Sequence, residues 1–260
     1  MSATQLPTTS KAWLITGTNG VDSLEQTTVP VPALDAYEVL VRFGAVSLNF
    51  RDLAIAKGQY PFHTALPVVA VSDGGGAVVA VGAKVRGLAP GDVVATLFHQ
   101  GHQFGALDAA SMRTGLGGAL DGALREFAVF EAAGLVKAPA GWTCAQAATL
   151  PVAALTAWNA LYGGARALRA GDAVLVQGSG GVSVFALQLA KAAGAFVCAT
   201  TSSAAKAARL TALGADVVLN YRTTPAWGLA ARAAAPHGEG YDFIVEVGKW
   251  ARCGEACGLC

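Results

Sequence analysis

The second half of the chain alternates short apolar runs with stretches of helical periodicity. Runs of strand length predict β-strands at 173–177, 196–200, 217–219 and 243–247. Between them, apolar positions recur at helical spacing and predict helices at 182–193, 204–213 and 227–235. The strand runs are mostly apolar, which is typical of strands buried on both faces of a parallel sheet. The alternation predicts an α/β fold with a doubly wound parallel sheet.

The first half has a different pattern, in which β-branched runs are interrupted by Gly, Pro and Asp. These runs are VLVRFGAVSL (39–48), VVAVSDGGGAVVAVG (68–82) and GDVVATLF (91–98). Their spacing predicts a compact, partly open β-barrel or sandwich. The change of pattern predicts a β-domain over 1–150 and an α/β domain over 151–248.

A glycine cluster joins the first apolar run of the α/β half to the helix that follows. Gly178 is expected to make the tight turn, and Gly180 to let the backbone approach a pyrophosphate. The helix start then offers free N–H groups and the positive end of its dipole. Ser183 stands where the fingerprint has its third glycine and is small enough for close helix–strand packing. The cluster predicts dinucleotide binding, with a strand-to-helix turn that holds no ligand as the alternative.

Charge and composition narrow the class of protein. The chain carries 18 Lys and Arg against 17 Asp and Glu, a net charge of +1, and has no long basic run. This balance argues against a nucleic-acid or anionic-membrane partner and favours a small-molecule substrate. No apolar stretch reaches the ~18 residues of a membrane span. The N-terminus lacks the apolar core of a secretory signal, and the cysteines of the body are irregularly spaced, so we expect a reducing, cytoplasmic location.

Four segments together resemble the medium-chain dehydrogenase/reductase superfamily. They are NFRDLAIAKGQYP (49–61), SDGGGAVVAVGAKVRGLAPGDVV (72–94), LPVAALTAWNAL (150–161) and VLVQGSGGVSVFALQLAKAAGA (174–195). The chain is most similar to the zinc-independent members that resemble quinone oxidoreductases and enoyl reductases. The resemblance implies a GroES-like β-domain followed by a Rossmann domain, and hydride transfer with a nicotinamide cofactor.

The positions that carry the catalytic zinc ligands in this superfamily hold other residues here. The resemblance aligns them with Asn49, Ser72 and Val152, none of which is a good zinc ligand, so we expect no zinc. His99 and His102 form an H-x-x-H pair in a glycine-broken segment, which indicates a solvated or substrate-facing loop rather than a metal site. Without a Lewis acid to stabilise an alkoxide, we expect reduction of an activated double bond, quinone or carbonyl. An NAD(P)-dependent alcohol dehydrogenase is the alternative.

The end of the second α/β strand bears on the choice between NADPH and NADH. NAD-selective folds place an Asp or Glu there, whereas the run 196–200 is followed by TSSAAK, without a carboxylate. We therefore expect NADPH, with NADH as the alternative. The resemblance implies Ser202, Lys206 and Tyr221 as contacts of the 2′-phosphate. In the alternative interpretation, Ser202 or Ser203 only caps the next helix and Lys206 is solvated.

The resemblance also implies residues that face the nicotinamide and the substrate. Asn49 is expected to bind the nicotinamide ribose or the substrate carbonyl, and Asp52 to orient its loop. Tyr60 is a candidate proton donor, although a tyrosine before proline is also a common packing residue. Thr156 is implied as a cofactor contact, with a buried helix-start hydroxyl as the alternative. The cofactor contacts implied at the glycine turn are Gly178, Gly180, Gly181 and Val182.

Residues 249–260 depart from the superfamily pattern. The superfamily continues its sheet beyond Gly248, whereas this chain reads KWARCGEACGLC, with cysteines at 253, 257 and 260. A reading-frame or splice change is the favoured explanation, ahead of a genuine short isoform and a cysteine-rich metal clip. We expect this form to bind the adenosine half of the cofactor better than the nicotinamide half. We also expect it to be impaired in catalysis, solubility and the homodimerisation of the complete family. A catalytically weak dinucleotide-binding module and an interaction protein are therefore alternatives to an active reductase.

Overall fold

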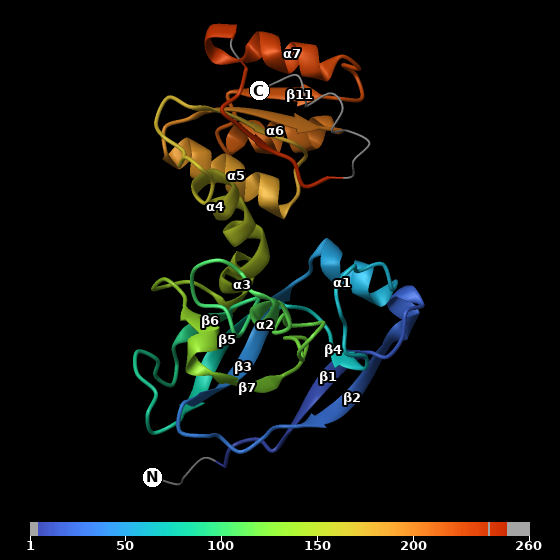
Figure 1. Cartoon of the computed structure of the whole chain (residues 1–260), viewed down its shortest axis with the longest axis vertical. Coiled ribbons are helices and arrows are strands. Elements are labelled where there is room, and N and C mark those ends of the chain that lie inside the picture. The colour runs from blue at the N-terminus through green and yellow to red at the C-terminus, as the bar shows by residue number, and fades with distance from the viewer. Residues whose placement is uncertain (1–4, 239, 249–260) are drawn as a thin grey trace. The chain divides into compact units, whose positions relative to one another are not determined.

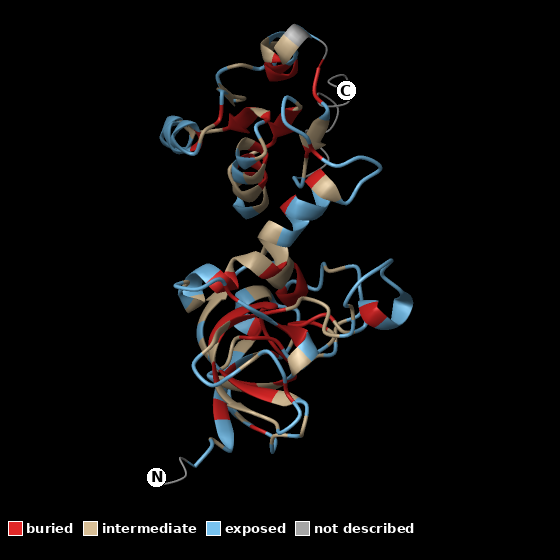
Figure 2. Ribbon diagram, turned by 90° about the vertical axis from the view of Figure 1, so that its left-hand side faces the viewer, coloured by how far each residue is buried: buried red, intermediate tan, exposed pale blue. Residues whose placement is uncertain are grey.

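The computed structural model describes residues 5–238 and 240–248, and it divides into two compact units between Val152 and Ala153. Figure 1 shows a first unit built mainly from strands and a second unit in which strands and helices alternate. In Figure 2 the buried residues gather on the strands of each unit. The predicted Cys-rich segment 249–260 lies outside the described residues. The helices that are described are too short or too polar to span a lipid bilayer.

Two antiparallel sheets form the first unit. One has the strand order β7 (Phe127–Glu131), β3 (Glu38–Ser47), β5 (Asp73–Val81), β6 (Val93–Thr96) and β8 (Leu135–Lys137). The other has the order β2 (Leu24–Pro30), β1 (Thr9–Ile15) and β4 (Val68–Val69). Val39 and Val41, two positions apart on β3, pack with Val94 and Phe130 in a buried core. The β-rich first half is therefore confirmed.

The helical segments of this unit are short and connect the strands. They are η1 (Gly20–Ser23), α1 (Phe50–Ala56), α2 (Ala109–Met112), η2 (Ala132–Gly134) and α3 (Cys144–Ala148), followed by the π-helical turn η3 (Leu150–Ala154).

The β-branched run at 68–82 contains a break whose place the sequence pattern did not indicate. The structure has two strands there, β4 and β5, which belong to different sheets. Between them Val71 has a φ of 70°, in the left-handed region that β-branched residues rarely adopt. The N–H groups of Gly122 and Ala123 donate to the carbonyls of Val69 and Val71, both at 2.7 Å, and hold this turn in place. The residues of the turn are buried and start with the apolar Ala70 and Val71, so hydropathy did not mark where β4 ends.

The second unit is a parallel sheet with helices packed on it. Its strand order is β11 (Val217–Asn220), β10 (Phe196–Thr201), β9 (Ala173–Val176) and β12 (Phe243–Val245), and every described neighbouring pair is parallel. Its helical segments are α4 (Leu155–Tyr162), α5 (Gly181–Ala192), α6 (Ala204–Ala212), α7 (Trp227–Ala234) and η4 (Pro236–Gly238). The predicted strands and helices are confirmed to within about two residues at their ends, and with them the α/β fold.

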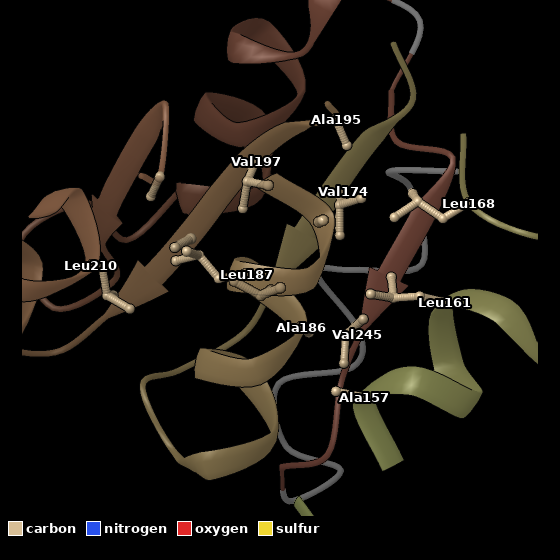
Figure 3. Packing of buried hydrophobic residues seen from close by; sticks show 14 residues of the cluster. Ala157, Leu161, Leu168, Val174, Ala186, Leu187, Ala195, Val197, Leu210 and Val245 are labelled. Atoms are coloured by element: carbon tan, nitrogen blue, oxygen red, sulfur yellow. The ribbon is translucent and has the colours of Figure 1, made fainter. Parts of the chain in front are cut away.

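Both faces of β9 are buried, which explains its uninterrupted apolar sequence. Val174 and Val176 contribute to a cluster that contains Leu187 of α5 and Leu161 of α4 (Figure 3). The alternate residue Leu175 joins a second cluster, which includes residues of α7. Because side chains alternate along a strand, a strand covered on both sides has no polar face.

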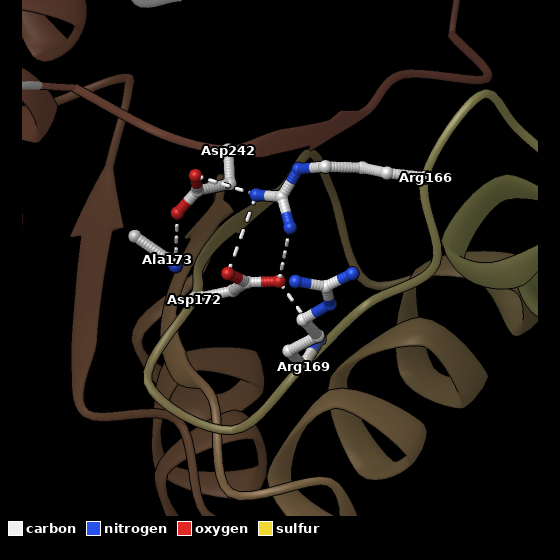
Figure 4. A network of polar contacts seen from close by, with 5 residues as sticks. All are labelled: Arg166, Arg169, Asp172, Ala173 and Asp242. Carbon is white, nitrogen blue, oxygen red and sulfur yellow. Dashed lines mark hydrogen bonds and ion pairs between the residues drawn. The ribbon is translucent and has the colours of Figure 1, made fainter.

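A polar network holds the starts of β9 and β12 together (Figure 4). Both Nη atoms of Arg166 donate to the carboxylate of Asp172, at 2.9 and 3.2 Å, and Nη2 also donates to Asp242 Oδ1 at 2.6 Å. Asp242 Oδ2 accepts the N–H of Ala173 at 2.8 Å. The network therefore ties the loop before β9 to the residue before β12, and so helps to set the neighbouring positions of these two strands.

Candidate functional site

The glycine turn of the second unit leaves open space in front of a helix. Gly178 has a φ of +84°, which favours glycine, and Gly180 directly precedes α5. A Cβ built at either position would meet no described heavy atom within 4 Å. The free N–H groups at the start of α5 therefore face a space that an anion such as pyrophosphate can enter.

Ser183 replaces the third glycine and also makes a specific contact. It is buried in the first turns of α5, and its hydroxyl donates to the carbonyl of Gln177 at 2.8 Å. Gly181 lies close to the side chain of Ala153, where a Cβ would come to 3.1 Å. The side chain of Val182 is partly buried against the core, so only its backbone is suited to a ligand.

Three buried polar atoms at the carboxyl edge of the parallel sheet have no hydrogen-bond partner among the described residues. They are Gln177 Nε2 after β9, Thr201 Oγ1 at the end of β10 and Glu246 Oε2 after β12. The strand order reverses between β9 and β12, and ligands of such sheets bind at this switch point. A buried polar group without a partner is costly, so this edge suits a ligand that supplies hydrogen bonds. The chemistry and the open space of the glycine turn fit a dinucleotide.

Sequence reasoning missed this trio as a functional group. The signal was present, because each of the three residues is polar and ends or follows an apolar strand. Their common edge is evident only from the strand order.

The structure shows the surroundings of the residues predicted to bind a 2′-phosphate. Ser203 caps α6 by accepting the N–H of Lys206 at 3.4 Å, so the helix-capping interpretation holds for Ser203. The Lys206 side chain is exposed, and Ser202 is half-buried. Tyr221 packs partly buried against the second core cluster. The hydroxyl of Thr200 accepts the N–H of Gly178 at 3.1 Å and links the end of β10 to the glycine turn.

Thr156 is the second residue of α4 and is exposed. The alternative interpretation of a buried hydroxyl is therefore wrong.

In the first unit, the residues at the former zinc-ligand positions gather around a buried carboxylate. Asp73 Oδ1 accepts the hydroxyl of Ser72 at 2.6 Å, and Oδ2 accepts the N–H of Val152 at 3.0 Å. The Asn49 amide lies near enough to lower the pKa of Asp73. Its Nδ2 atom nevertheless reaches hydrogen-bond geometry with no described residue. Burial is the largest influence on Asp73 and raises its pKa.

Asp52 holds the backbone at Asn49. The segment that resembles a loop of the superfamily is a helix over Phe50–Ala56, and Asn49 is its N-cap residue. Asp52 Oδ2 accepts the N–H of Asn49 at 2.7 Å, the reciprocal bond of a capping box. Burial raises the pKa of Asp52 to about 6, and the nearby charge of Asp73 adds to this while Arg51 opposes it. The N-x-x-D spacing could have predicted this helix start.

This donor set does not fit zinc. Structural and catalytic zinc sites are built from Cys, His and carboxylate ligands. The Ser72 hydroxyl and the Val152 backbone N–H both already donate hydrogen bonds to the Asp73 carboxylate. The described residues contain no group of three or more His, Cys, Asp and Glu side chains placed to hold a metal.

The first unit also contains a pocket of about 150 Å³, lined by Arg51, Tyr60, His63 and His99 together with mainly apolar residues. The Arg51 guanidinium makes cation–π contacts with the rings of Tyr60 and Phe98, its Cζ lying 4.8 and 4.6 Å from their centroids. Its Nη1 donates to the carbonyl of Leu116 at 2.8 Å. Tyr60 therefore combines a packing contact with a position on the pocket wall.

His99 also lines this pocket, which supports the substrate-facing interpretation of its segment. Burial lowers the pKa of His99, partly offset by the Ser111 backbone, and so favours its neutral imidazole. The His102 N–H donates to the His99 carbonyl within a turn, so the two residues do not share a helix face. Arg51 was not among the predicted site residues, and only tertiary packing reveals its place.

Comparison with known proteins matches both units to families. Residues 35–140 match the alcohol dehydrogenase GroES-like domain, and residues 181–250 match the zinc-binding dehydrogenase family. The chain is 44% identical over 232 residues to a zinc-type alcohol dehydrogenase-like protein of Schizosaccharomyces pombe, covering 88% of this chain and 67% of that protein. It is 38% identical to a chloroplast envelope quinone oxidoreductase homolog of Arabidopsis thaliana, covering 87% of this chain and 64% of that protein.

A solved structure of the alcohol dehydrogenase type from Sinorhizobium meliloti 1021 superposes with a TM-score of 0.88 at 37% identity. The match covers 98% of this chain and 74% of that one. The chain thus spans about two-thirds to three-quarters of the length of these relatives.

Proposed function

The chain belongs to the medium-chain dehydrogenase/reductase superfamily and is an NAD(P)H-dependent oxidoreductase, and we propose that it is an NADPH-dependent, zinc-independent reductase. Its acceptor in this proposal is an activated carbon–carbon double bond, a quinone or a carbonyl. One of the relatives above is a quinone oxidoreductase homolog, which supports this class of acceptor.

The observation that carries the proposal is the arrangement around Asp73. The ligand positions hold an amide, a hydroxyl and a main-chain N–H, and the last two are used to bind the carboxylate. Oxidising a simple alcohol requires a group that stabilises an alkoxide, and these residues provide no Lewis acid. An enone or a quinone disperses the developing charge over its own carbonyl, so hydrogen-bond donors and a proton source suffice.

Each candidate residue has a role consistent with its surroundings. The unpartnered Asn49 amide donates to the nicotinamide ribose or to the acceptor carbonyl, and Asp52 positions it by holding its backbone. Tyr60, on the pocket wall beside Arg51, donates the proton. When NADPH is bound, it supplies a hydride. An enone then gains that hydride and one proton to become a saturated ketone, and a quinone gains them to become a hydroquinone.

The cofactor site follows from the second unit. The glycine turn and the start of α5 hold the pyrophosphate, and Thr156 and the trio at the carboxyl edge of the sheet bind the remaining polar groups. NADPH is preferred because the end of β10 carries hydroxyls in place of an acid. Ser202, Lys206 and Tyr221 are the proposed contacts of the 2′-phosphate.

The test measures NADPH consumption by the full chain with 1,4-benzoquinone and with methyl vinyl ketone, before and after treatment with a chelator. We expect turnover that the chelator leaves unchanged. Oxidation of cyclohexanol with NADP⁺ that requires added zinc would overturn the proposal in favour of an alcohol dehydrogenase. NADPH binding without turnover of either acceptor would overturn it in favour of a dinucleotide-binding module.

A further inference from the structure

The pocket of the first unit has one permanently charged side chain on its wall, that of Arg51, beside Tyr60, His63, His99 and a mainly apolar remainder. The wall contains no acidic residue. From this we propose that the pocket binds a small flat carboxylate and that Arg51 anchors it. The proposal rests on the proposed function in one respect, since it takes this ligand to be the acceptor that is reduced.

Arg51 is held rigidly, which makes it a suitable anchor. The rings of Tyr60 and Phe98 both pack against its guanidinium, and Nη1 is fixed by the Leu116 carbonyl. None of the ion pairs found among the described residues includes Arg51. A planar guanidinium offers donors along its edge, and carboxylates bind such an edge with two parallel hydrogen bonds.

Glycines leave room for this cation. A Cβ at Gly118 would lie 2.6 Å from Arg51 Nη2, and one at Gly115 would lie 3.5 Å from the same atom. A side chain at Gly118 would crowd the charged group, whereas one at Gly115, which also lines the pocket, would be in ordinary van der Waals contact with it.

Another polar group on the wall supports an oxygen ligand. His99 lines the pocket, and burial lowers the pKa of its imidazole and so favours the neutral ring. A neutral imidazole donates one hydrogen bond and accepts another. As a pocket-lining residue, His99 can therefore donate one hydrogen bond to a carboxylate bound there.

Size and polarity define the remainder of the ligand. Phe62, Leu107 and Met112 supply apolar wall, and the volume of about 150 Å³ matches a cavity that holds one six-membered ring. A single ring or a short unsaturated chain that carries one carboxylate fits these limits. A phosphate ester fits less well because it carries more negative charge, and Arg51 is the one permanently charged cation that lines the pocket.

The experiment titrates the full chain with benzoate and with benzamide, which have nearly the same shape and differ in charge. We expect benzoate to bind at least tenfold more tightly by calorimetry. Arg51→Met should abolish this preference. The matched control is Arg86→Met, which removes an exposed arginine that also donates to backbone carbonyls and should keep the preference. Equal binding of the two probes, or a preference that survives in Arg51→Met, would overturn the proposal.

A second variant keeps the test decisive if Arg51→Met does not fold. Met112→Trp fills the pocket without altering charge, so it should reduce benzoate binding at least tenfold, and unchanged binding would overturn the proposal. These titrations measure binding and do not depend on catalytic turnover, so they test the pocket separately from the proposed function. Arg51-dependent benzoate binding without NADPH consumption refutes the proposed function alone. Quinone reduction without a benzoate preference refutes the carboxylate inference alone.

Discussion

Replacing Asp52 with Asn should make the protein more stable at neutral pH. The folded protein buries this carboxyl near Asp73 and raises its pKa from the ordinary 3.8 to about 6. In the unfolded chain the same group ionises at about pH 4. Between these values the folded state holds the extra proton, so this group makes the stability of the wild type fall as the pH rises. Asn cannot ionise, and its side-chain oxygen still accepts the N–H of Asn49.

The expected magnitude follows from the difference between the two pKa values. At about 1.4 kcal/mol for each pKa unit, the change from 3.8 to about 6 corresponds to about 3 kcal/mol. Part of the side chain remains accessible and is screened by solvent, so a gain of about 2 kcal/mol is the more realistic value. The gain should be complete above the folded pKa of about 6 and absent near pH 4.

The assay is urea unfolding of the wild type and Asp52→Asn over a series from about pH 4 to pH 8. The measured quantity is the difference in unfolding free energy between the two proteins at each pH. Asp22→Asn, which replaces an exposed carboxylate in η1, is the control for a general effect of removing a negative charge. A difference that stays constant across the series would refute the burial of an ionised Asp52.

Three further predictions concern the cofactor, the proton and the fold. Lys206→Ala should weaken NADPH binding by about 1–3 kcal/mol and leave NADH binding unchanged, since one charge-assisted contact is lost. The control is Arg209→Ala, an exposed residue on the same helix, and equal losses for both cofactors in a fluorescence titration would exclude Lys206 as the discriminator. Tyr60→Phe keeps the ring against Arg51 but removes the hydroxyl, so kcat should fall about a hundredfold while thermal unfolding is little changed; full activity would show that Tyr60 only packs. Ser183→Ala should cost about 1–2 kcal/mol of stability in urea unfolding because the buried carbonyl of Gln177 loses its donor, and an unchanged stability would indicate that the bond contributes nothing.

The glycine turn is a part of the candidate site that local sequence was able to predict. The order of strand, glycines and helix identified Gly178 and Gly180, because a positive φ and an open helix start depend on a few consecutive residues. Gln177, Thr201 and Glu246 were not recognised as a group. They are far apart in the chain, and only the parallel strand order brings them to one edge.

In the first unit, most of the site geometry depends on tertiary contacts and not on local sequence. Sequence alone established that Asn49, Ser72 and Val152 lack the ligand chemistry of zinc. It did not reveal that Asp73 binds two of them or that its charge acts on Asp52. These effects arise from burial and proximity, which have no periodic signature in the chain.

The sequence by itself determined the type and order of most elements, since helix and strand periodicity depend on neighbouring residues. It also determined the glycine turn between β9 and α5 and the absence of Cys and His at the ligand positions, which are matters of residue identity. Only the tertiary structure decided that the run at 68–82 enters two different sheets and that Arg51 contacts Tyr60 and Phe98. The physical reason is that such contacts join distant segments, and the free energy of burying them depends on how the sheets and loops pack rather than on local pattern.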